Sequence, residues 1–271
     1  MKLALWQTAG FPADIGANLA ALSKTAGAAA SAGASLLLCP ECWLCGYNIG
    51  DEVAALAEPR DGSSAQAICA IARRHRIAIA YGYAERDGAS GDIYNAVQVI
   101  GPEGTPLGHY RKTHLFGPAE RAAYRAGSCF ETPFELGGLR FGLLICYDVE
   151  YPETVRSLAL LGADVVLVPT ALTGEYSAVP DLLVPARAVE NQVFVAYCNH
   201  AGEENGMHFL GGSRLVDLDG RPIAAAGAGE ALLIGALDPS RREAAAKVYP
   251  YKNDRRPELY GLVTSNSNVQ R

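Results

Sequence analysis

Short apolar runs alternate along this chain with longer stretches in which apolar residues recur every three or four positions. The short runs are rich in aliphatic and β-branched side chains, which is typical of strands. In the first half these predicted strands are residues 3–8, 36–39, 77–83 and 93–100. The longer stretches predict amphipathic helices: one follows an N-cap residue, Asp14, and another covers residues 63–74.

The second half repeats this alternation without a linker rich in Pro, Gly and Ser and without a repeat of fixed period. The predicted strands there are residues 141–146, 164–168, 193–198, 213–218 and 231–237, and the predicted helices are residues 152–161 and 182–192. The run at 36–39 is continuously apolar, as expected of a strand that is covered on both faces. We therefore predict one α/β domain over residues 1–271, with two layers of strands and outer helices. Periodicity is weak over residues 247–271, which predicts an arm that docks elsewhere.

Composition narrows the class of protein. The 271 residues are 49% hydrophobic and 19% charged, with a formal net charge of −6 and no basic block. Nonspecific nucleic-acid binding needs clustered Lys and Arg, so we expect no nucleic-acid partner. No apolar run reaches the roughly 18 residues of a membrane helix. The apolar stretch at the start of the chain is shorter than a secretory signal requires. We expect a cytoplasmic protein with no membrane partner.

The seven cysteines are an odd number, and most lie in apolar contexts, which favours reduced thiols over a disulfide framework. Cys39, Cys42 and Cys45 have the spacing C-x-x-C-x-x-C, which admits a rival hypothesis, a metal-binding protein. No fourth cysteine follows nearby, and Cys69 lies in a helical pattern. We therefore expect no metal and treat these cysteines as core side chains.

Three reactive side chains lie where predicted strands end: Glu41, Lys112 and Cys146. Ligand crevices of α/β sheets form at the carboxyl ends of strands, so these residues predict a thiol-nucleophile site. A carboxylate can take the thiol proton, and an ammonium group stabilises both the thiolate and the negative oxygen of an attacked carbonyl. The alternative for Cys146 is a core side chain. A scaffold without activity is disfavoured, because burying both charged groups costs several kcal/mol unless they are paired.

The chain resembles the nitrilase superfamily of carbon–nitrogen hydrolases over nearly its whole length. The segments that carry the resemblance are Leu-Cys-Pro-Glu41 with Gly46-Tyr47, Tyr-Arg-Lys112-Thr-His-Leu-Phe, and Gly-Leu-Leu-Ile-Cys146-Tyr-Asp with Tyr151-Pro152-Glu153. They occur in the order of the family's catalytic segments. The resemblance implies a four-layer α-β-β-α sandwich whose subunits pair, with C-terminal arms that often cross to the partner. It therefore implies a homodimer or a higher homo-oligomer.

The resemblance also implies roles for individual residues. Glu41 matches the general base, Lys112 the charge-stabilising lysine, Cys146 the nucleophile and Glu120 the second glutamate, which positions the amide. The backbone N–H of Tyr147 matches the second oxyanion donor. In the implied reaction the Cys146 thiolate attacks the amide carbonyl, and ammonia leaves after Glu41 returns a proton to it. Water activated by Glu41 then hydrolyses the remaining thioester, with no metal or organic cofactor.

Within the superfamily the chain is most similar to bacterial amidases that act on short aliphatic and ω-amino amides, the 5-aminopentanamidase group. A carbamoyl-amino-acid hydrolase or a nitrilase is the alternative within the superfamily. Many relatives have Arg where this chain has Glu150, and a carboxylate there attracts an ammonium group and repels a carboxylate. A structural ion pair of Glu150 is the other interpretation. Family position also places Thr170 and Ala171 at the substrate pocket.

Overall fold

The computed structural model describes residues 1–265, and its centre is formed by two six-stranded sheets that pack face to face. The first sheet has the order β14 (Ala231–Ala236), β1 (Lys2–Gln7), β2 (Leu36–Leu38), β3 (Ala78–Arg86), β4 (Ile93–Ile100) and β5 (Pro106–Arg111). The second has the order β13 (Pro222–Ala225), β12 (Arg214–Val216), β9 (Phe194–Asn199), β8 (Val165–Thr170), β7 (Leu139–Leu143) and β6 (Phe134–Leu136). A short hairpin, β10 (Glu203–Glu204) and β11 (Met207–His208), lies outside both sheets.

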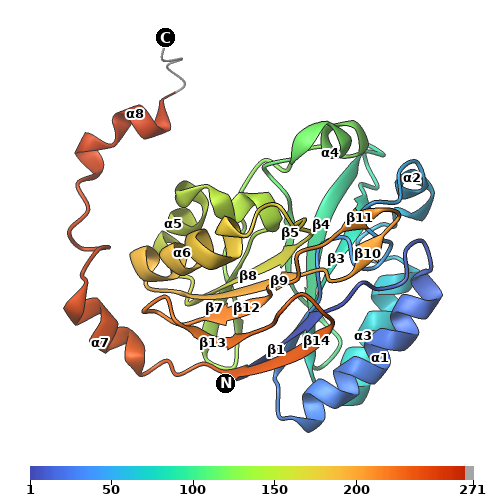
Figure 1. Ribbon diagram of the computed structural model, residues 1–271, viewed down its shortest axis with the longest axis horizontal. Coiled ribbons are helices and arrows are strands. Elements are labelled where there is room, and N and C mark those ends of the chain that lie inside the picture. The colour runs from blue at the N-terminus through green and yellow to red at the C-terminus, as the bar shows by residue number, and fades with distance from the viewer. Residues whose placement is uncertain (266–271) are drawn as a thin grey trace.

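Helices cover the outer faces of the two sheets (Figure 1). The first sheet is covered by α1 (Ile15–Ser31) and α3 (Ser63–His75), and the second by α5 (Pro152–Leu160) and α6 (Val184–Asn191). As predicted, Asp14 caps α1, because its carboxylate accepts the Ala17 N–H at 2.8 Å. The predicted four-layer α-β-β-α sandwich is confirmed. Within residues 1–265, no helix combines the length and hydropathy that crossing a membrane requires.

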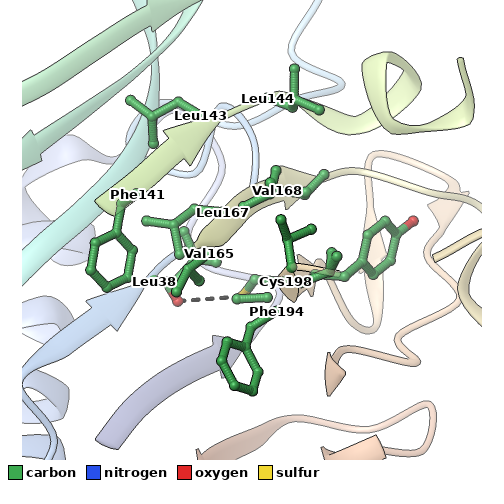
Figure 2. Close-up of a cluster of buried hydrophobic side chains, with 14 of the residues drawn as sticks. Leu38, Phe141, Leu143, Leu144, Val165, Leu167, Val168, Phe194 and Cys198 are labelled. Carbon is green, nitrogen blue, oxygen red and sulfur yellow. Dashed lines mark hydrogen bonds between the residues drawn. The ribbon is translucent and has the colours of Figure 1, made fainter. Parts of the chain in front are cut away.

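The continuous apolar runs are explained by burial on both faces. In β2, Leu36 and Leu38 face the core between the sheets, while Leu37 packs with the helices outside. Figure 2 shows Leu38 opposite Phe141 and Leu167 of the second sheet. The thiol of Cys198 joins the two sheets, because it donates to the Leu38 carbonyl at 3.3 Å (Figure 2).

Strand direction brings the predicted reactive residues to one edge. β2 and β3 are parallel, and β5 runs the same way because β4 is antiparallel to both of its neighbours. In the second sheet β7, β8 and β9 are also parallel. Glu41 follows β2, Lys112 follows β5 and Cys146 comes after β7. The short segments α2 (Glu52–Leu56), α4 (Gly117–Ala123) and η1 (Cys146–Glu150) lie at this edge, and η2 (Val179–Leu183) contacts η1.

One predicted boundary is wrong. The strand expected over residues 141–146 ends at Leu143, and Cys146 begins the 3₁₀ turn η1 instead. Pairing with β8 ends at Leu143, and the chain turns at Cys146, whose φ of +49° lies in the left-handed region and does not fit a strand.

The C-terminal segment runs along the outside of the sandwich (Figure 1). Its first part stays in contact with the sandwich, because the Gln192 side chain donates to the Ala245 carbonyl at 2.9 Å. The segment contains α7 (Arg241–Val248), η3 (Pro257–Leu259) and α8 (Gly261–Thr264), and no residue of α7 is buried. The weak periodicity in the sequence did not predict α7. The predicted arm over residues 247–271 extends beyond the described residues from residue 266 onward.

Candidate active site

Lys112 lies at the centre of the site and is completely buried between two carboxylates. Its ammonium nitrogen is 2.7 Å from Glu41 Oε1 and 2.7 Å from Glu120 Oε1. The three side chains come from separate segments, which follow β2, follow β5 and lie within α4. An ammonium group has three N–H donors, so the third remains available for a substrate oxygen.

Backbone and side-chain contacts fix this arrangement. The Lys112 N–H donates to the Asn95 carbonyl at 2.8 Å, and the Asn95 side chain donates to Glu41 Oε1 at 2.7 Å. Tyr47 donates its hydroxyl proton to Glu120 Oε1 at 2.7 Å. Asn95 therefore holds both the lysine segment and the first carboxylate. The spacing of the sequence alone did not identify Asn95.

Glu41 sits in a loop that crosses β3 at very close range. A Cβ atom on Gly82 would lie 2.5 Å from the Cys42 nitrogen and 2.8 Å from Glu41 Cα, so only glycine permits this approach. On the other side of the loop, buried His200 lies with its Nε2 2.7 Å from the Glu41 carbonyl oxygen. Glu41 Oε2 is buried and has no hydrogen-bond partner among residues 1–265. That oxygen is therefore the free acceptor of the site.

The electrostatics favour one proton distribution. Burial raises the pKa of the Glu41 carboxyl, and the Lys112 charge offsets this only in part. Burial also raises the pKa of the Cys146 thiol, and the Glu41 charge raises it further. Burial alone would lower the pKa of the Lys112 ammonium, but the charges of Glu41, Cys146 and Glu120 raise it. The resting site therefore holds a thiol, an ammonium group and a carboxylate able to accept a proton.

Cys146 and Glu120 are the members of this group that border a cavity. The cavity has a volume of about 300 Å³, and Cys146 and Glu120 lie in its wall, whereas Glu41 and Lys112 are buried beside them. Tyr147 also borders the cavity and is the second residue of η1. N–H groups in the first turn of a helix have no acceptor within the helix, so the Tyr147 N–H is suited to a substrate oxygen.

The rest of the cavity wall is mainly apolar and aromatic. Phe116 is part of this wall, and the centroid of its ring is 5.2 Å from that of Tyr147 and 6.2 Å from that of Tyr176. Ala171 borders the cavity as expected. Thr170 does not: its hydroxyl donates to the Val168 carbonyl at 3.1 Å, so it supports the wall from behind.

Glu150 contributes a second carboxylate to the wall. It is half-buried, and burial raises the pKa of its carboxyl, although Lys112 and Arg187 act in the opposite direction. Arg187 donates to the backbone carbonyl of Glu150 at 2.6 Å and pairs with the Glu190 carboxylate at 3.1 Å. Among the described residues the Glu150 carboxylate itself has neither an ion-pair nor a hydrogen-bond partner.

The three cysteines of the C-x-x-C-x-x-C spacing do not converge. Cys39 packs with the helices outside the first sheet, whereas Cys42 and Cys45 belong to a separate apolar cluster with Tyr124. Within residues 1–265, no three His, Cys, Asp or Glu side chains are arranged to hold a metal ion. The thiol of Cys42 instead lies 3.5 Å from the Tyr124 hydroxyl.

Comparison with known proteins gives a consistent set of relatives. Residues 2–247 match the sequence profile of the family described as carbon-nitrogen hydrolase. A protein of Pseudomonas protegens called hydrolase in pqqF 5'region is 48% identical over 261 residues, which cover 96% of this chain and 90% of that protein. An (R)-stereoselective amidase of a Pseudomonas species is 39% identical, covering 100% of this chain and 97% of its own.

Solved structures agree with this result. A double mutant of the amidase from Nesterenkonia sp. AN1, solved in complex with acrylamide, superposes with a TM-score of 0.88. It is 35% identical, and the match covers 97% of each chain.

Proposed function

Because the chain belongs to the carbon–nitrogen hydrolase family of the nitrilase superfamily, we propose that it is an amidase that hydrolyses a short aliphatic carboxamide to a carboxylate and ammonia. One observation carries the proposal. Lys112 lies 2.7 Å from both Glu41 and Glu120, beside a cysteine that borders the cavity. The relatives named as amidases support the choice of an amide.

The first half-reaction forms a thioester. The Cys146 thiol gives its proton to Glu41 as the sulfur bonds to the amide carbon, and the carbonyl oxygen becomes an oxyanion held by Lys112 and the Tyr147 N–H. Glu41 then gives the proton to the amide nitrogen, the C–N bond breaks, and ammonia leaves. Glu120 keeps Lys112 in place and is positioned to accept from the amide N–H of the substrate.

The second half-reaction releases the acid. Glu41 takes a proton from water, whose oxygen attacks the thioester carbon, and the same two donors stabilise the oxyanion. The C–S bond breaks, the sulfur regains its proton from Glu41, and the carboxylic acid leaves. Every step uses only side chains of this protein, one backbone N–H and water.

The test is ammonia release from a panel of simple amides, with a nitrile and an N-carbamoyl amino acid in parallel. We expect turnover of amides by the wild type and none by Cys146→Ala. Cys129→Ala is the matched control, because Cys129 is exposed and lies away from the cavity. Turnover of the nitrile or the carbamoyl compound without any amide would refute the amidase proposal.

We also propose that the preferred amide carries an ammonium group, as 5-aminopentanamide does. The support is Glu150, a half-buried carboxylate without a partner among the described residues in an aromatic cavity. A carboxylate and aromatic faces both attract a cation. We expect wild-type kcat/KM to be about tenfold higher for 5-aminopentanamide than for pentanamide, a difference of about 1.4 kcal/mol.

Glu150→Gln should remove that preference, whereas Glu153→Gln, which changes an exposed carboxylate three residues further on, should keep it. The measurement is the ratio of kcat/KM for the two substrates in each variant. An equal loss for both substrates in Glu150→Gln would show that Glu150 does not recognise the amine.

A second copy of the chain is the partner that we propose for the C-terminal arm. The arm exposes large apolar side chains, including Tyr249, Leu259 and Leu262. Exposed apolar groups in this number favour an interface. We expect a dimer or larger assembly of the full chain in sedimentation equilibrium, and dissociation after Leu259→Ser with Leu262→Ser. A monomeric wild type would refute this assignment.

A further inference from the structure

Asp148 is a completely buried carboxylate that does not line the cavity. Both of its oxygens are occupied. Oδ1 accepts from the Thr113 hydroxyl at 2.9 Å and the His114 N–H at 2.9 Å, and lies 2.8 Å from His114 Nδ1. Oδ2 accepts from the Tyr110 hydroxyl at 2.9 Å and the Ile145 N–H at 3.1 Å. This is a large number of donors for one side chain.

These donors come from two segments that the chain separates by more than 30 residues. Thr113 and His114 directly follow Lys112, and Ile145 directly precedes Cys146. The Asp148 carboxylate is therefore the shared acceptor between the lysine segment and the nucleophile turn. Arg187 holds the far side of the same turn through the Val149 carbonyl at 3.0 Å.

The nucleophile turn needs such support because of its backbone. Cys146 has a φ of +49°, which for a residue other than glycine costs on the order of 1–3 kcal/mol. Asp148 closes the turn twice: its N–H donates to the Ile145 carbonyl at 3.0 Å, and its carboxylate accepts the Ile145 N–H.

We propose that Asp148 is a positioning residue that sets the distance between the Cys146 thiol and the Lys112 ammonium group. It acts through Ile145 on one side and through Thr113 and His114 on the other, without touching the substrate. This inference rests on the proposed function, because the proposed reaction needs the Cys146 thiol and the Lys112 ammonium group at a fixed distance from each other.

The substitution Asp148→Asn removes one hydrogen-bond acceptor at this position without changing the size of the side chain. The amide has the shape of the carboxylate, but it has one acceptor oxygen instead of two, and its NH₂ group faces either the Ile145 N–H or the His114 N–H. One of the two segments must then move away. Misplacement of reacting groups by about 1 Å lowers turnover by roughly 10²-fold.

We therefore expect kcat of Asp148→Asn to fall by about 100-fold, with KM within about threefold of the wild type. A second measurement distinguishes positioning from a simple loss of charge. The rate at which iodoacetamide alkylates Cys146 is followed against pH. Loss of a negative charge alone would move the midpoint to lower pH, whereas separation from Lys112 would move it to higher pH. The proposal requires the shift to higher pH.

Asp164→Asn is the matched control. Asp164 is also a buried aspartate that accepts a backbone N–H, that of Arg140 at 2.9 Å, but it precedes β8 at the opposite end of the strand from Thr170. This variant should lose stability and keep both its kcat and the pH midpoint of alkylation.

If Asp148→Asn does not fold, Tyr110→Phe and Thr113→Val carry the test, since each removes one donor and leaves the carboxylate. A several-fold lower kcat with the shifted midpoint supports the proposal, and wild-type kcat in both overturns it. An unchanged or lower alkylation midpoint in folded Asp148→Asn also overturns it. Alkylation needs no amide turnover, so a wild type that hydrolyses no amide would refute the proposed function while this test could still be read.

Discussion

Lys112→Met gives the most direct test of the buried charge cluster. Methionine keeps most of the length and volume of lysine but removes the charge, so Glu41 and Glu120 lose the cation that lies 2.7 Å from each of them. Both carboxylates are buried, and removing one partner of a buried pair costs about 3–5 kcal/mol. We expect a loss in that range for the free energy of unfolding at pH 7.5.

The loss in the free energy of unfolding of Lys112→Met should become smaller as the pH falls. Without Lys112, burial holds the pKa of the Glu41 carboxyl in the folded variant above the value of about 4.3 in the unfolded chain. Between these values the folded form binds more protons, so the stability of the variant is lost as pH rises and recovered as pH falls. The measurement is urea unfolding at fixed protein concentration at pH 5.5 and 7.5, with kcat for an amide alongside. Turnover should fall by at least 10²-fold, as after loss of an oxyanion donor.

Lys247→Met is the control, because Lys247 and Glu243 form an exposed pair on α7 at 2.7 Å. Such pairs contribute about 0–1 kcal/mol. A deficit for Lys112→Met no larger than that of the control, or one that grows as the pH falls, would refute the charge assignment.

Other parts of the structure give further predictions. Gly82→Ala places a methyl group 2.5 Å from the Cys42 nitrogen, so we expect the free energy of unfolding measured with urea to fall by about 1–3 kcal/mol and kcat to fall at least about tenfold. Gly88→Ala is the control and should change neither, because a Cβ there meets nothing within 4 Å. The pKa of Glu41 is raised by burial, so kcat/KM measured from pH 4 to 8 should fall on the acid side with a midpoint above the value of about 4.3 for a free carboxyl. A constant kcat/KM down to pH 4 would contradict Glu41 as the base. Cys39→Ala should lower the free energy of unfolding by about 1 kcal/mol and leave turnover unchanged, also after treatment with a chelator; loss of activity with chelator would revive the metal hypothesis.

Much of the fold was predictable because burial on both faces leaves a continuous apolar run in the sequence. The run at 36–39 became β2, and the spacing after Asp14 became α1. The end of β7 was not predictable in this way, because residues 143–146 continue the apolar run while the backbone turns at Cys146. The pattern of apolar residues indicates which positions are buried, but it does not indicate the backbone angle φ at each position.

The positions of Glu41, Lys112 and Cys146 near strand ends were predictable from the sequence, and the residues that hold them in place were not. Glu41, Lys112 and Glu120 meet as the family resemblance implied. The roles of Asn95 and Asp148 depend on contacts between segments that are distant in the chain, and neither residue type is distinctive in the sequence. For Glu150 the sequence left an ion pair open, and the structure pairs Arg187 with Glu190 instead.

Glu41 Oε2 accepts no hydrogen bond from residues 1–265, and this links the stability of the protein to its turnover. A buried acceptor without a donor lowers stability by about 1–3 kcal/mol. Laboratory selection for thermal tolerance alone would favour substitutions that give this oxygen a hydrogen-bond donor or remove the carboxylate. Such variants would lack the base that accepts the proton of the Cys146 thiol. We expect the most heat-resistant descendants of this chain to be among its poorest catalysts unless the gain comes from elsewhere in the molecule.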